Sequence, residues 1–134
     1  MSTIKANTLT GTSTAGSIAV TGEGGSTTTN LQQGLCKAWI NMDGSGTVSV
    51  RDSLNNSSIT DNGTGNYTVT HTNNFSSANN SPVIGTGSTG VRIYPDLADS
   101  STVGTSVYGI IAGNASGTLT DARICTGHAA GDLA

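Results

Sequence analysis

Residues 35–51 read LCKAWINMDGSGTVSVR, and this stretch decides the fold class. Its first half alternates, so that Cys36, Ala38 and Ile40 point to one side of an extended chain and Trp39 points to the other. A period of two is the mark of a β-strand that carries one row of side chains on each face. We therefore expect a strand here, with both of its faces partly covered.

Two hairpins are expected around this strand and after it. The small and polar residues 43–46 (DGSG) form a turn that leads into residues 47–51, and a longer loop at 61–65 joins residues 59–60 to residues 67–71. Asp-Gly and Asn-Gly pairs favour the positive backbone angles that tight hairpin turns need.

The remainder of the chain predicts further short strands. These are expected at residues 82–84, 90–94, 106–111 and 119–124, and residues 127–134 are expected to form a loose tail. Glycine- and serine-rich turns separate the strands, a pattern typical of antiparallel sandwiches. We therefore predict an all-β, jelly-roll-like antiparallel β-sandwich of about six to eight strands.

The N-terminal part differs from the rest. Residues 1–34 are small and polar and are expected to form an extended attachment arm, which ends in one short helix that Thr28 or Thr29 caps and Gly34 stops. Residues 35–134 are expected to form the sandwich domain. An arm without a core of its own is ordered only by pairing with a partner or with other copies.

Composition favours an assembly over an isolated chain. Only 34% of the residues are hydrophobic and 4% are aromatic, so one copy has few large apolar side chains to bury. Charged residues make up only 10%, which separates the chain from disordered proteins with high charge. We therefore expect that neighbouring copies of the chain complete a thin core.

Charge and hydropathy exclude two classes of partner. The net charge is −3, and the five basic residues are spread along the chain, whereas nucleic-acid binding needs clustered Lys and Arg. No apolar run approaches the roughly 20 residues of a membrane-spanning helix. The first residues lack a secretory signal, so synthesis in a cytoplasm is expected.

The sequence has no convincing catalytic or metal site. His71 and His128 are not in a metal-binding spacing, and His71 is expected to be a structural strand residue and His128 a solvated residue of the tail. Asp96, Asp99 and Asp121 are the carboxylates that a polysaccharide depolymerase would have to use, but nothing in the sequence pairs them. We expect a non-enzymatic protein that needs no cofactor.

The two cysteines, Cys36 and Cys125, follow no metal-binding pattern. They could pair only if the fold brings them together. Free, partly buried thiols are the simpler expectation.

A family resemblance adds to this interpretation. Residues 31–41 (LQQGLCKAWIN), 43–48 (DGSGTV), 51–55 (RDSLN) and 58–69 (SITDNGTGNYTV) resemble a module that recurs in tail-fibre and related virion proteins of bacteriophages, especially marine ones. Residues 5–16 and 21–28 resemble the leader that often precedes this module. The resemblance covers about residues 1–84.

The resemblance implies a homotrimer on the virion, assembled in the infected bacterial cytoplasm, that attaches through its N-terminus and faces outward with its C-terminal domain. Near the three-fold axis we expect Leu31, Leu35 and Trp39. Host-facing recognition of a surface glycan or protein is expected from side chains after Pro82, namely Arg92, Tyr94, Tyr108 and Arg123.

Three functions follow from this interpretation. A tail fibre or short spike-like appendage leads, because the chain lacks the extended shaft of long fibres. A capsid decoration protein that stabilises the phage head, as a cement or head-fibre protein, is the alternative with the same expected fold. A polysaccharide depolymerase ranks lowest.

Overall fold

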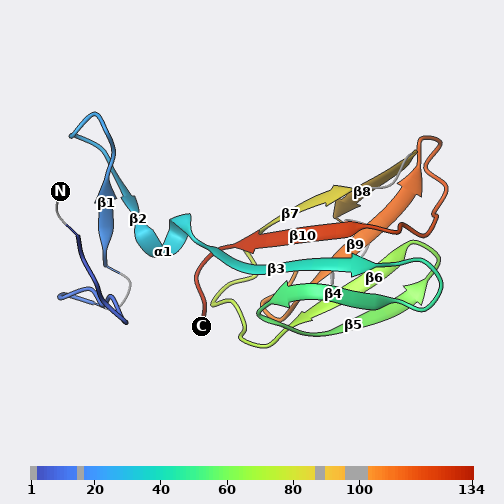
Figure 1. Ribbon diagram of the computed structural model, residues 1–134, viewed down its shortest axis with the longest axis horizontal. Helices are drawn as coiled ribbons and strands as arrows, with labels where there is room; N and C mark the ends of the chain where they lie inside the picture. The colour runs from blue at the N-terminus through green and yellow to red at the C-terminus, as the bar shows by residue number, and fades with distance from the viewer. Residues whose placement is uncertain (1–2, 15–16, 87–89, 96–102) are drawn as a thin grey trace. The chain divides into compact units, whose positions relative to one another are not determined.

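The computed structural model describes residues 3–14, 17–86, 90–95 and 103–134 of the chain (Figure 1). The chain divides into two compact units, Met1–Leu35 and Cys36–Ala134. We call them the N-terminal unit and the sandwich unit.

The N-terminal unit is built around one small hairpin. Strands β1 (Ala19–Thr21) and β2 (Thr28–Asn30) pair antiparallel, and the single-turn helix α1 (Leu31–Gly34) follows. Every residue of both strands is exposed, and none of the described residues of this unit belongs to the buried hydrophobic core. The short helix ends at Gly34 as expected, whereas an extended arm was expected where the hairpin lies.

The described residues of the sandwich unit form eight strands in two four-stranded antiparallel sheets (Figure 1). One sheet, which we call the β3 sheet, has the order β4-β3-β10-β7, and the other, the β6 sheet, has the order β5-β6-β9-β8. The strands are β3 (Cys36–Asp43), β4 (Ser49–Leu54), β5 (Asn56–Gly63), β6 (Asn66–His71), β7 (Ser81–Thr86), β8 (Val91–Pro95), β9 (Val107–Asn114) and β10 (Cys125–Ala130).

The alternation in the sequence determines which side chains enter the core. In β3, Ala38, Ile40 and Met42 are buried, while Trp39 on the other face is half-buried. The main cluster of buried side chains lies between the two sheets and combines residues of β3, β10, β6 and β9. Burial of one such large apolar side chain contributes about 1.5–3 kcal/mol to folding. These side chains give the single chain a buried cluster of its own.

The C-terminal part of the chain differs from the expectation, because it contains strand β10. The predicted strand at 119–124 is not a strand apart from an isolated bridge at Leu119, and the predicted loose tail contains most of β10, which pairs with both β3 and β7. Gly127 on the inner face of β10 packs against a large ring, because a Cβ atom there would lie 2.9 Å from the Tyr108 hydroxyl. A strand built from small residues has no hydrophobic signal in the sequence.

The strand order also corrects the jelly-roll-like expectation. The first and last strands of the sandwich, β3 and β10, are neighbours, but the consecutive pairs β3–β4, β5–β6 and β8–β9 each stay within one sheet. In a jelly roll most consecutive strands alternate between the two sheets. The fold is thus an antiparallel sandwich with its own connection order.

A partly buried hydrogen-bond network fixes the loop between β9 and β10. The Tyr67 hydroxyl donates to the Gly44 carbonyl at 2.9 Å and lies 3.0 Å from Asp121 Oδ1, which also accepts from the Gly65 N–H at 2.8 Å. We call Gly44, Gly65, Tyr67 and Asp121 the Asp121 clasp. The Asp121 carboxylate therefore connects the loop between β9 and β10 to the turn at Gly65 directly, and to the turn at Gly44 through Tyr67.

Candidate functional site

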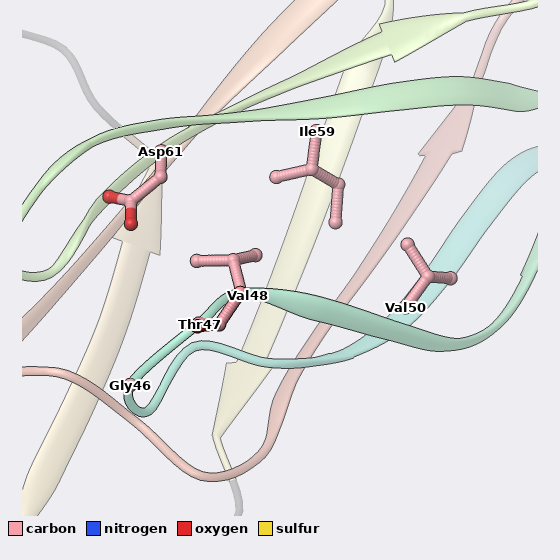
Figure 2. A pocket seen from close by; sticks show the side chains of 6 residues that line it. All are labelled: Gly46, Thr47, Val48, Val50, Ile59 and Asp61. Carbon is pink, nitrogen blue, oxygen red and sulfur yellow. The ribbon is translucent and has the colours of Figure 1, made fainter.

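An open pocket lies between two edge strands that follow one another in the chain. Strands β4 and β5 are the edge strands of their sheets, and the pocket between them has a volume of about 450 Å³. Figure 2 shows Ile59 of β5 pointing toward Val48 and Val50, while the carboxylate of Asp61 is turned to the side. Gly46, Thr47, Val48, Val50, Ile59 and Asp61 line it.

A β-bulge aims Val50 into this pocket. The register between β3 and β4 shifts between Asn41 and Met42, so that Arg51 is the extra residue and Val50 lies opposite the buried Met42. The Arg51 guanidinium folds back onto the end of β3, where it donates to the Met42 carbonyl at 2.8 Å and pairs with Asp43 at 2.6 Å. Hydrogen bonds from Ser45, together with the nearby guanidinium, lower the pKa of Asp43.

The lining of the pocket combines apolar and polar groups. Val48, Val50 and Ile59 form apolar walls, and Asp61 is the one carboxylate among the described residues that line the pocket. Its Oδ1 accepts a hydrogen bond from the Gly63 N–H at 2.9 Å. Glycoside hydrolysis needs a second carboxyl group across the substrate, at roughly 5–9.5 Å. The lining can contact an apolar group that carries a polar or cationic end.

A polysaccharide depolymerase would have to use two of the carboxylates Asp96, Asp99 and Asp121. Asp121 is engaged in the clasp. Asp96 and Asp99 lie outside the described residues. The described residues therefore bring no pair of these three carboxylates together.

The residues predicted for the three-fold axis lie in both units. Leu31 is half-buried and Leu35 is 51% exposed, both in the N-terminal unit. Trp39 lies on the outer face of the β3 sheet, opposite Leu54 of β4 and His128 of β10 in the strand register. Leu54 is 47% exposed, so this outer face carries apolar surface.

The prediction of a recognition role is wrong for one of the four residues, Tyr108. Tyr108 is fully buried, because its ring fills the core between β9 and β10, and it cannot contact a host surface in this fold. Arg92 and Arg123 are exposed. The backbone of Tyr94 pairs with Ile111, and the Tyr94 side chain lies outside the described part of the structure.

His71 is a buried strand residue, as predicted. Its ring lies 5.0 Å from that of Phe75 and 5.3 Å from that of Tyr108. Asn56 uses its amide nitrogen on the carbonyls of Trp39 and Leu54, so its Oδ1 accepts from His71 Nδ1 at 3.2 Å. Nδ1 therefore carries the proton of the neutral ring, and Nε2 is buried without a partner among the described residues.

This environment predicts a loss of stability in mild acid. Burial lowers the pKa of His71 below its ordinary value, so the unfolded chain takes up a proton more readily than the folded chain. We expect the free energy of unfolding to fall as the pH drops below about 6.5, by at most about 1.4 kcal/mol for each pH unit. Urea titrations between pH 8 and pH 5 measure this slope.

Two substitutions separate this effect from other groups. His71→Gln removes the titration and should flatten the profile in that range. His128→Gln changes an exposed imidazole and should keep the fall. An unchanged slope in His71→Gln would refute the assignment.

Two further side chains that are far apart in the sequence lie close together in the structure. The Cys36 sulfur lies 4.0 Å from His128 Nδ1, although 92 positions separate them in the chain. Cys36 is exposed and Cys125 is buried, and both are free thiols, as expected. His128 is exposed as predicted, but it lies on a central strand instead of in a tail.

Comparisons with known proteins add no relative. No protein-family model, curated protein or solved structure matches the chain. Among the described residues, no helix is long and apolar enough to cross a membrane.

Proposed function

We propose that this chain is a non-enzymatic structural protein of a bacteriophage virion, a tail fibre or short spike-like appendage that acts as a homotrimer. Its N-terminal unit attaches it to other virion proteins, and its sandwich unit faces outward and binds the host surface. The sequence resemblance supplies the virion context, and the division of the chain into two unlike units supports the division of labour.

The observation that carries the proposal is the exposure of the N-terminal unit. Its apolar side chains Ile4, Leu9, Val20 and Leu35 are 88%, 62%, 50% and 51% exposed. Water disfavours that much open apolar surface on a segment with so little structure of its own. Contact with partner chains removes it from water, which is the role of an attachment segment.

The same surface argues for self-association. The sandwich has its own core, so the copies do not need to share its interior. The surface left to cover is Leu31 and Leu35 of the N-terminal unit, and Trp39 with Leu54 on the outer face of the β3 sheet. Packing of these side chains between copies gives the trimer its apolar contact.

Host contact is assigned to the sandwich. The β4–β5 pocket offers apolar walls beside the Asp61 carboxylate, and Arg92 adds an exposed cation on β8. Edge strands and turns of a rigid sandwich suit recognition, because their side chains vary without disturbing the core.

Removal of the N-terminal unit tests the assembly. We expect the full chain to sediment as a trimer at micromolar concentration. A chain that begins at Cys36 should stay folded, because the sandwich core is internal, and should sediment mainly as a monomer, because it has lost Leu31 and Leu35 from the proposed contact. Analytical ultracentrifugation gives the mass, and circular dichroism gives the fold. A full chain that stays monomeric at these concentrations would remove the trimer from the proposal.

Localisation tests the virion role. Antibodies raised against the sandwich should label phage tails in electron micrographs. Label on heads would favour the capsid decoration protein instead, and unlabelled particles from a lysate that contains the protein would contradict both.

A further inference from the structure

We propose that Cys36 and His128 form a binding site for a thiophilic divalent cation such as Zn²⁺ at one end of the β3 sheet. The two residues lie on the neighbouring antiparallel strands β3 and β10. Both are exposed, so a cation from solution reaches them without any change in the fold.

A register irregularity helps to place the thiol. Along β10, His128 lies opposite Trp39 and Ala129 opposite Ala38, but Ala130 lies opposite Cys36 and not Lys37. This shift between Ala129 and Ala130 leaves Lys37 as the extra residue. In a regular ladder, Cys36 would lie one position farther along β10 from His128.

The distance between the two groups is close to that of a chelate. Zn–S and Zn–N bonds of about 2.3 and 2.0–2.1 Å at a tetrahedral angle place sulfur and nitrogen about 3.6 Å apart. The observed separation of 4.0 Å is a few tenths of an ångström wider. Small side-chain rotations close that difference.

The proton balance is simple. The Cys36 thiol now points at the Ala38 carbonyl, 3.1 Å away. On binding it releases its proton to solvent and the thiolate coordinates the cation. His128 coordinates through the Nδ1 lone pair of its neutral form, with its proton on Nε2.

The site is open rather than closed. Among the described residues no third His, Cys, Asp or Glu completes a cluster. Water or an external ligand fills the remaining positions, so the cation exchanges readily, unlike the ion of a four-ligand structural site. Thiolate and imidazole together favour zinc and other thiophilic ions over Mg²⁺ and Ca²⁺.

Cys125 does not compete for the cation. It is buried in the sandwich core, and this burial raises the pKa of its thiol to about 11. A thiolate signal in the native protein therefore reports Cys36 alone.

Cobalt titration of the full chain tests the proposal, because Co²⁺ takes zinc sites and a thiolate ligand produces a charge-transfer absorption in the near ultraviolet. We expect this band in the wild-type protein and its loss when Zn²⁺ is added. Cys36→Ser should abolish the band. His128→Gln should weaken Co²⁺ affinity at least tenfold.

The matched control is Cys125→Ala, which keeps the pair and should bind Co²⁺ as the wild type does. Its fold is checked by circular dichroism, and alkylation of native wild-type protein at Cys36 gives the same loss of the band without any substitution. The proposal is overturned if the wild type shows no thiolate band, if Cys36→Ser retains it, or if His128→Gln binds with unchanged affinity.

Discussion

Replacement of Gly65 by alanine is expected to destabilise the sandwich by about 3 kcal/mol or more, the largest effect of any single substitution proposed here. Gly65 has a φ of +67°, a region that costs a residue with a Cβ atom about 1–2 kcal/mol. An added Cβ would also lie 2.8 Å from the Thr120 nitrogen and still closer to the Ala112 carbonyl oxygen. Both neighbours are backbone atoms, so neither can rotate away.

The clash reaches the Asp121 clasp as well. The Gly65 N–H donates to Asp121 and its carbonyl accepts from Ala112 at 2.7 Å, so a shift of this residue breaks contacts on both sides. Urea unfolding at a fixed chain concentration measures the change in the free energy of unfolding.

Gly46 provides a matched control. It has nearly the same φ, +65°, but an added Cβ there meets nothing within 4 Å. Gly46→Ala should therefore cost only the backbone term, about 1 kcal/mol. Equal losses in the two variants would show that backbone angle alone, and not close packing, governs Gly65.

The parts of the fold that sequence could predict are those where one face of a strand is clearly apolar. The burial of Ala38 and Ile40 on one face of β3 follows directly from alternation, and the structure confirms it. Cys36 was expected on the same face but is exposed, because the register with β10 shifts between Ala129 and Ala130. The all-β class follows from the same alternation and from the turn residues between strands. These are local signals, and a short window of sequence contains them whole.

The parts that could not be predicted depend on contacts between distant segments. Strand β9 is buried at every position from Tyr108 to Gly113, so alternation could not reveal that Tyr108 points inward. Gly127 of β10 has no side chain where the ring of that tyrosine fills the space opposite it.

The candidate sites have the same limitation. The pocket depends on a bulge at Arg51 that no residue pattern predicts. The Cys36–His128 pair joins residues from opposite ends of the sequence of the sandwich unit.

The two buried tyrosines give the second large prediction, because loss of one hydroxyl group should have opposite consequences at the two positions. Tyr67→Phe is expected to cost about 2 kcal/mol, since it removes the bond to the Gly44 carbonyl and the contact with the charged Asp121. It also leaves the buried Gly44 carbonyl without the hydrogen bond that the tyrosine hydroxyl donates. Burial and the carboxylate both raise the pKa of Tyr67, which keeps its hydroxyl a donor at any ordinary pH.

Tyr108→Phe is the internal control, and it should be neutral or stabilising. The Tyr108 hydroxyl is fully buried and has no hydrogen-bond partner among the described residues, so it carries the cost of desolvation without return. Phenylalanine keeps the ring that fills the core against Gly127. Both variants are compared by urea unfolding at pH 8, where His71 is neutral, so that only the hydroxyl differs. If Tyr108→Phe loses as much stability as Tyr67→Phe, the Tyr108 hydroxyl has a partner in solution, and an ordered water beside His71 Nε2 and Tyr108 would be the first place to seek it.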